Sequence, residues 1–191
     1  MTRRQFDILV SLAGAVVVVV LLVAGGLLMW GATFANSNVH NQLAKQEIHF
    51  PPKAALAHAK PGTEITPGMI PYIAPFAGKE VLTGEEAEVF ADHFIAVHLS
   101  ELPYHGVYAK ISAAAREHPE NKELQALEQV SFQGTTLRGL LLEAYAFGTI
   151  GEVMFWGSIA SFVLAAVLAV FVALGLRHAG RVKPQTPVFT A

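Results

Sequence analysis

Two uncharged apolar stretches decide the fold of this chain: ILVSLAGAVVVVVLLVAGGLLMWGATF at residues 8–34 and VMFWGSIASFVLAAVLAVFVALGL at residues 153–176. As a helix rising about 1.5 Å per residue, the second stretch alone would be roughly 36 Å long, which exceeds a hydrocarbon core of about 30 Å. Neither stretch contains Asp, Glu, Lys or Arg, so a lipid bilayer is the environment that suits both. We therefore expect an all-α membrane protein with two transmembrane helices.

The charged residues predict the orientation of the two spans. Five of the thirteen basic residues lie in the tails 1–7 and 177–191, namely Arg3, Arg4, Arg177, Arg181 and Lys183. Because basic flanks tend to stay in the cytoplasm, we expect both termini there, residues 35–152 outside, and the chain in the plasma membrane. The segment from Lys45 to Glu143 holds eight basic and thirteen acidic residues, which argues against nucleic acid as a partner.

The first stretch is expected to be an uncleaved signal anchor. Its apolar run is longer than the roughly 7–15 residues of a signal-peptide core, and no clean A-x-A cleavage site ends it. Trp30, Phe155 and Trp156 lie near the predicted outer ends of the spans, where aromatic side chains favour the membrane interface.

The segment between the spans is predicted to combine a proline-rich arm with a small extracytoplasmic helical bundle. Residues 36–46 contain no Gly or Pro and should continue the first helix outward, whereas residues 51–82 hold six of the ten prolines and should form an extended, irregular arm. The sequence Thr83-Gly84-Glu85-Glu86 matches a capping box. Four helices are predicted from there on, at about 83–102, 107–117, 120–132 and 135–147, with ends at Pro103 and Gly134.

The sequence lacks the motifs of common catalytic sites. It contains no cysteine, which excludes thiol nucleophiles, disulfides and thiolate metal sites. Nucleophile-elbow, P-loop and dinucleotide-binding motifs are absent, and neither span carries an ionisable residue that would indicate a transport or haem pathway. The acidic residues Glu85, Glu86 and Glu88 lie where they complement a helix dipole. We therefore expect no catalytic residue, no cofactor and no enzyme activity.

Histidines supply the one candidate metal site. Seven of the eight lie between His40 and His118, and the densest group includes His98, Glu101 and His105. Spacings of three and four residues place side chains on one helix face, so these three are candidate ligands for zinc or copper, although Pro103 interrupts the helix between them. The plainer interpretation is that the histidines are solvated or core residues that cap helix ends.

The second span carries small residues at every fourth position: Gly157, Ser161, Ala165, Ala169 and Ala173. Such residues let helix backbones approach closely in lipid. This stripe is the predicted helix-packing face, directed against the first span, a second copy of the chain in a homo-oligomer, or another subunit. The first span offers Gly14, Gly25 and Gly26 in return.

Three segments carry a resemblance to other proteins: FANSNVH at 34–40, ADHFIAVHL at 91–99 and LRGLLLEAYAF at 137–147. The chain resembles a group of uncharacterised bacterial two-span membrane proteins with an extracytoplasmic helical domain. The resemblance implies the two-span topology and adds no catalytic or ligand-binding residue.

These features favour a non-enzymatic accessory or scaffold subunit of a larger membrane protein complex, with a respiratory complex as one candidate. The expected partners are other integral membrane proteins and the lipid bilayer. Two alternatives stay open: an extracytoplasmic sensing or metal-binding module anchored by two spans, and a membrane-anchored hydrolase that uses carboxylates. Metal analysis and identification of co-purifying chains would separate these hypotheses.

Overall fold

The computed structural model describes residues 2–182 of the chain. The protein is mostly helical, at 80%, and no β-strand occurs in the described part. The prediction of a helical protein with two long apolar helices is confirmed. Lys183 and the rest of the predicted tail to residue 191 lie outside the described residues.

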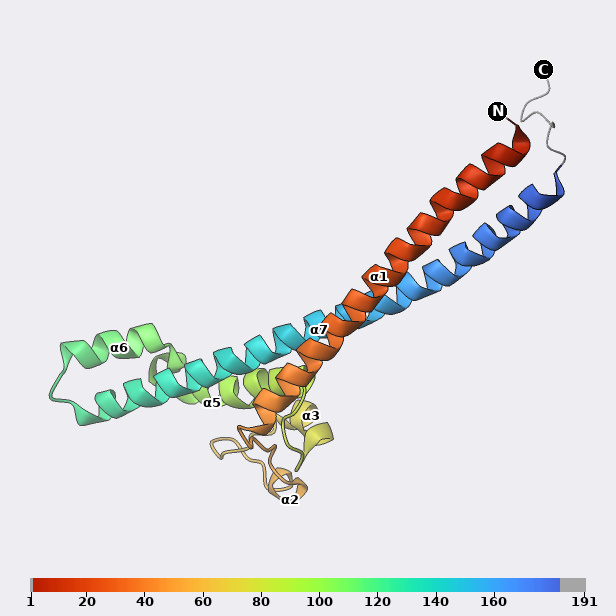
Figure 1. Cartoon of the computed structure of the whole chain (residues 1–191). Coiled ribbons are helices and arrows are strands. Elements are labelled where there is room, and N and C mark those ends of the chain that lie inside the picture. Colours follow the sequence, from red (N-terminus) through yellow and green to blue (C-terminus); the bar gives the residue numbers. More distant parts are fainter. Residues whose placement is uncertain (1, 183–191) are drawn as a thin grey trace. The chain divides into compact units, whose positions relative to one another are not determined.

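The chain divides into two compact units. One comprises the described residues of 1–34 and 151–191, and we call it the helix-pair unit; the other comprises residues 35–150, and we call it the central unit. Helix α1 (Arg3–Ala44) and helix α7 (Lys122–Arg181) each contribute residues to both units, as Figure 1 shows by their colours.

Both long helices have the length and composition needed to cross a membrane. The predicted extension of the first helix beyond residue 34 is confirmed, because α1 ends at Ala44. The predicted breaks at Gly134 and after Phe147 are wrong, because α7 continues through both for 60 residues, or about 90 Å. A glycine inside a helix costs only about 1 kcal/mol, and Gly134 and Gly148 each lie where another segment approaches closely, at Leu99 and Gly84.

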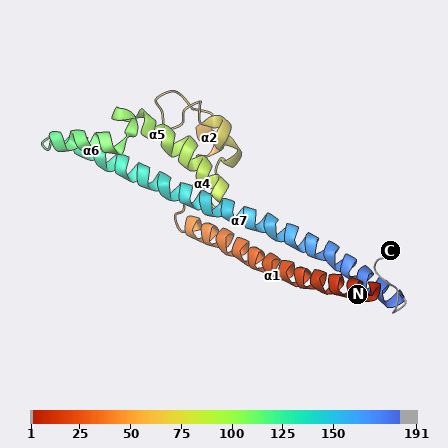
Figure 2. The same cartoon turned by 90° about the horizontal axis from the view of Figure 1, so that it is seen from above.

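In the helix-pair unit, α1 and α7 lie side by side (Figures 1 and 2) and meet along a regular seam. On each helix, a series of less exposed residues alternates spacings of four and three. The series is Asp7, Ser11, Gly14, Val18, Leu21, Gly25, Leu28 and Ala32 on α1, and Met154, Ser158, Ser161, Ala165, Leu168, Val172, Gly175 and Ala179 on α7. A mean spacing of 3.5 residues is the coiled-coil repeat, which keeps one face of each helix toward its partner. Small residues dominate the most buried positions, so the two backbones can approach closely.

The central unit contains the shorter helices. They are α2 (Lys53–Leu56), α3 (Ile70–Ile73), the 3-10 turn η1 (Ala74–Phe76), α4 (Gly84–Phe90), the π-helical turn η2 (Ala91–Ile95), α5 (Ala96–Glu101), the 3-10 turn η3 (Pro103–Gly106) and α6 (Tyr108–Glu117). The capping box at Thr83 is confirmed, since its hydroxyl accepts from Glu86 N–H at 3.2 Å. The predicted end at Pro103 is also confirmed, because Leu102 before it is extended.

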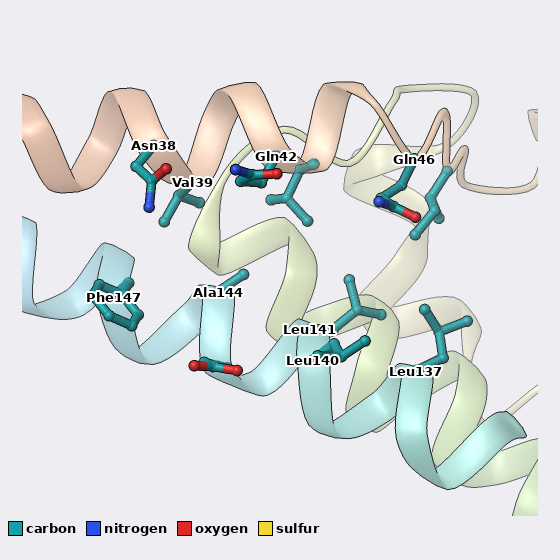
Figure 3. A pocket seen from close by; sticks show the side chains of 12 residues that line it. Asn38, Val39, Gln42, Gln46, Leu137, Leu140, Leu141, Ala144 and Phe147 are labelled. Atoms are coloured by element: carbon teal, nitrogen blue, oxygen red, sulfur yellow. The ribbon is translucent and has the colours of Figure 1, made fainter. Parts of the chain in front are cut away.

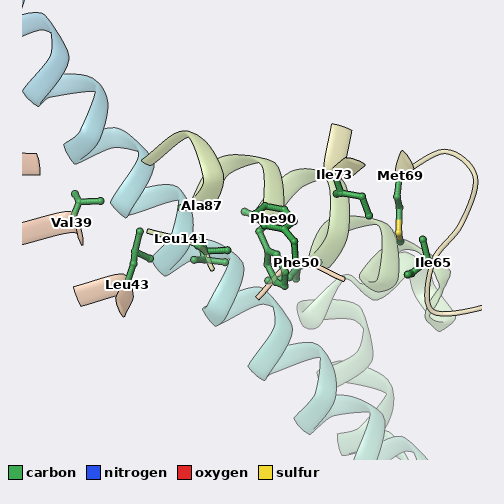
Figure 4. Close-up of a cluster of buried hydrophobic side chains, with 12 residues drawn as sticks. Val39, Leu43, Phe50, Ile65, Met69, Ile73, Ala87, Phe90 and Leu141 are labelled. Carbon is green, nitrogen blue, oxygen red and sulfur yellow. The ribbon is translucent and has the colours of Figure 1, made fainter. Parts of the chain in front are cut away.

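The expected extended arm at residues 51–82 is instead folded onto the core of the central unit. Met69, Ile73 and Val81 are fully buried there, beside Phe50 and Phe90, as Figure 4 shows for the labelled residues of this cluster. Pro71 and Pro75 do not prevent helix formation, because each stands in the first turn of its helix, where no N–H is needed. The apolar residues between the prolines therefore form the core rather than a free arm.

Candidate functional site

The central unit has a groove between the last turns of α1 and the middle of α7 (Figure 3). Its volume is about 320 Å³, and we call it the central groove. The side chains of Val39, Leu43 and Leu141 are buried at its base. Because these are core residues, the two walls of the groove stand on a fixed base.

One wall of the central groove is polar. It carries the carboxamides of Asn38, Gln42 and Gln46, spaced four residues apart, so that they follow one another along the same side of the segment. Each carboxamide offers an acceptor oxygen and two donor hydrogens. This wall can therefore hydrogen-bond a polar side chain or a backbone group of either kind.

The opposite wall is apolar and open. Leu137, Leu140 and Phe147 of α7 line it with 37%, 60% and 44% of their surfaces exposed, and Ala144 lies between the last two. The spacing 137, 140, 144, 147 again alternates three and four residues, which is the pattern of a helix-packing face. The Glu143 carboxylate also lines this wall. One polar wall and one apolar wall, each following a helical segment, suit an amphipathic helix as the occupant.

The structure does not bring the three predicted metal ligands together. His98 and Glu101 line one cavity of about 560 Å³ with Glu64, but His105 is not among its lining residues. His105 follows the extended Leu102 and has φ 55°, so it no longer shares a helix face with Glu101. His98 Nδ1 donates to the Phe94 carbonyl at 2.7 Å. Within residues 2–182, no group of three or more His, Asp or Glu side chains is arranged to hold a metal ion.

The neighbouring polar residues of the histidine-rich segment are engaged within the protein. Asp92, in the π-helical turn, accepts from Arg138 of α7, with Nη2 at 2.6 Å and Nε at 3.1 Å. The ring of His93 stacks on Tyr72, with ring centres 3.5 Å apart. These contacts fasten the α4–α5 segment to α7 and to the folded 51–82 segment, which gives Asp92 and His93 a structural role.

The predicted small-residue stripe of the second span is divided by the structure. Ala165 is buried at 1% exposure, Gly157 faces Leu28 of α1, and Ser161 is half-buried. Ala169 and Ala173 are exposed. A constant spacing of four advances about 40° around a helix at each step, so a stripe of five positions rotates away from a single partner. The exposed pair stays a predicted surface for a second copy or another subunit.

Sequence reasoning missed the residues of the central groove. Its apolar wall has a signal in the sequence, since Leu137, Leu140, Ala144 and Phe147 follow the three-four alternation. All four residues lie inside the predicted helix 135–147, but the other wall of the groove comes from the end of α1, about 100 residues earlier in the sequence. The polar wall gives no such signal, because polar residues such as Asn38 and Gln42 are common on any exposed helix surface.

Comparison with known proteins adds no relative. No family model, no curated protein and no solved structure matches this chain.

Proposed function

We propose that the protein is a non-enzymatic accessory or scaffold subunit of a larger membrane protein complex. In this proposal α1 and α7 cross the plasma membrane, both termini are cytoplasmic, and the central unit lies outside. The basic tails and the two uncharged spans support this placement.

The observation that carries the proposal is the open apolar wall of the central groove. Leu137, Leu140 and Phe147 lie before the uncharged stretch 153–176, in a region that the predicted span does not cover with lipid. Fully burying a Leu or Phe side chain contributes about 1.5–3 kcal/mol, so covering three of them provides a substantial part of a binding free energy. An exposed apolar row on a rigid helix is typical of a protein contact.

The shape and chemistry of the central groove favour a helix as the occupant. A helix of another integral membrane protein that extends beyond its own span would set apolar residues against Leu140 and Phe147. Its polar residues would meet the carboxamides of Asn38 and Gln42, as hydrogen bonds between helices do in membrane proteins. The Asn, Gln and Glu143 side chains then select register more than they add affinity.

Site-specific photocrosslinking tests this contact. A photoreactive benzoylphenylalanine at Leu140 should capture a specific integral membrane protein, identified by mass spectrometry from intact cells. The matched control places the same residue at Ala146, which is exposed on α7 but does not line the groove. Two results together would support the proposal. The probe at Leu140 captures the partner, and a second probe at Phe147 captures it in the otherwise unchanged protein but not in the Leu140→Glu variant. Equal capture at Leu140 and Ala146 would contradict it.

The topology is tested separately. A reporter fused after Ala191 should be active only if it functions in the cytoplasm, and one inserted at the Gly62 turn only if it functions outside. The reverse pattern would overturn the orientation. Activity of both reporters on the same side of the membrane would overturn the two-span topology.

A further inference from the structure

A second groove, in the helix-pair unit, lies between the beginning of α1 and the end of α7. It has a volume of about 640 Å³, and its lining extends from Phe6 to Val17 on α1 and from Leu168 to His178 on α7. We call it the terminal groove. Ten or eleven residue steps on a helix correspond to about 15 Å, which is half of a hydrocarbon core of about 30 Å. The terminal groove therefore has the depth of a single membrane leaflet.

The lining of the terminal groove is polar at one end only. Asp7, Ser11 and His178 lie at the end near the chain termini, and the remainder is formed by apolar or small residues such as Val17, Leu168 and Phe171. Asp7 directly precedes the uncharged stretch 8–34, and His178 follows the stretch 153–176 by two residues. In the proposed membrane placement, the polar end lies at the level of the lipid headgroups and the apolar part lies among acyl chains.

Asp7 lacks the donors that a carboxylate at such a site requires. Only 19% of its side chain is exposed, and its Oδ2 is covered and has no hydrogen-bond partner within residues 2–182. Among the described residues, the basic side chain nearest to it is that of His178, whose Nε2 lies 3.8 Å away, which is too far for a hydrogen bond. A carboxylate removed from water in this way is stabilised by a positive charge or an N–H donor beside it. Oδ2 itself is covered, but a ligand that brings an ammonium to the exposed part of the side chain would place a positive charge and an N–H donor beside the same carboxylate.

The charged side chains around the polar end of the terminal groove suit the phosphate of a lipid headgroup. Arg3, Arg4, Arg177 and Arg181 are exposed and lie within one turn or so of Asp7 or His178 along their helices. Guanidinium groups bind phosphate well, so they would hold the phosphate of a lipid whose amine reaches Asp7. A lipid without an amine would satisfy the arginines but not the carboxylate.

We propose that the terminal groove binds one phospholipid with a primary ammonium headgroup, of the phosphatidylethanolamine class. One acyl chain lies along the apolar part of the groove, the phosphate meets the arginines, and the ammonium donates to Asp7. A primary ammonium has three donors, whereas the quaternary ammonium of phosphatidylcholine has none, so the site distinguishes the two. The inference rests on the membrane placement proposed above.

Native mass spectrometry of the full chain, exchanged from detergent into nanodiscs of defined composition, tests this. Discs with equal amounts of phosphatidylethanolamine, phosphatidylcholine and phosphatidylglycerol should leave one phosphatidylethanolamine on the released protein, in about tenfold excess over the choline lipid. This comparison of retained lipids uses the wild-type protein alone. Equal retention of the ethanolamine and choline lipids, or no retained lipid, would overturn the proposal.

Two variants and one control locate the site. Asp7→Asn should remove the preference for the ethanolamine lipid while retention of phosphatidylglycerol persists through the arginines. Ala13→Trp, at an exposed residue that lines the groove, should reduce retention of every lipid by obstruction. The control Glu152→Gln removes an exposed carboxylate that does not line the groove and should change nothing. A preference that survives Asp7→Asn would place the ethanolamine lipid elsewhere.

The membrane placement is checked in the same samples. If alkaline carbonate extracts the protein from membranes, the proposed function fails together with the lipid site. If the protein stays in the membrane and shows no ethanolamine preference, the lipid proposal alone fails. The photocrosslinking experiment at Leu140 tests the central groove, so its result does not depend on whether the terminal groove prefers the ethanolamine lipid.

Discussion

The helix-pair unit and the central unit share the helices α1 and α7, yet among the described residues the large buried side chains lie in the central unit. In the helix-pair unit the most buried positions include Ser11, Ser158 and Ala165, whereas the central unit buries Phe50 and Met69 together with Ile73, Val81 and Phe90. In water, burial of large apolar surface is the main gain, at about 25 cal/mol per Å². In lipid that gain is absent, so close backbone approach and dispersion hold helices together. The difference between the units is what the proposed membrane placement predicts.

The aromatic residues allow the two units to be observed separately. Both tryptophans, Trp30 and Trp156, belong to the helix-pair unit, and all four tyrosines, at 72, 104, 108 and 145, belong to the central unit. Tryptophan fluorescence therefore follows the helix pair, and ¹⁹F NMR of incorporated fluorotyrosine follows the central unit. Each variant below is expected to affect one signal and leave the other unchanged.

The largest effect is expected in the central core. Phe50→Ala removes a side chain that is 2% exposed and contacts the rings of Phe76 and Phe90, with centres 5.3 Å from each. The lost burial and the cavity should lower the free energy of unfolding by about 3–5 kcal/mol. The Tyr72 fluorine signal during urea titration in detergent measures this. Phe132→Ala, at a residue that is 49% exposed, is the control and should cost much less. Equal losses would contradict the core described here.

The seam of the helix pair can be tested with one substitution at two positions of the predicted stripe. Ala165 is buried at 1% exposure and Ala169, four residues later, is exposed. Ala165→Leu should lower the stability of the helix pair by about 1–3 kcal/mol, because the added bulk forces the backbones apart. Ala169→Leu should change it by less than about 0.5 kcal/mol. Tryptophan fluorescence during titration with a denaturing detergent gives both values. Similar losses at Ala165 and Ala169 would show that the stripe, rather than the three-four seam, faces α1.

Local features of the fold could be predicted from the sequence. The two apolar helices follow from uncharged runs that are longer than a bilayer core, the capping box from Thr83 and Glu86, and the helix end from Pro103. Each of these signals is complete within a few residues. The three-four seam is also present in the sequence, but a constant spacing of four residues leads to Ala169 and Ala173 in place of Leu168 and Val172.

Features that depend on distant segments could not be predicted in this way. The continuity of α7 depends on contacts of Gly134 with Leu99 and of Gly148 with Gly84, which are far apart along the chain. A Cβ at Gly84 would lie 3.2 Å from the backbone of α7, so glycine here permits close packing rather than a break. The central groove likewise depends on α1 and α7 meeting across about 100 residues of sequence. The folding of residues 51–82 onto Phe50 and Phe90 belongs to the same class.

The smallest effect is expected at the capping box, which tests whether a locally encoded feature of the central unit is independent of the helix pair. Glu86 Oε2 accepts from the N–H groups of Leu82 at 2.9 Å and Thr83 at 3.0 Å, while the Thr83 hydroxyl accepts from Glu86 N–H. Thr83→Ala leaves that last N–H without its partner and should lower the free energy of unfolding of the central unit by about 1 kcal/mol. The matched control Thr135→Ala, at an exposed position inside α7, should be neutral or slightly stabilising, because alanine has the higher helix propensity. The fluorotyrosine transition should shift only for Thr83→Ala, and the tryptophan transition for neither variant. A loss that appears equally in both signals would show that the two units unfold together. The two units would then share one unfolding transition although they bury different side chains.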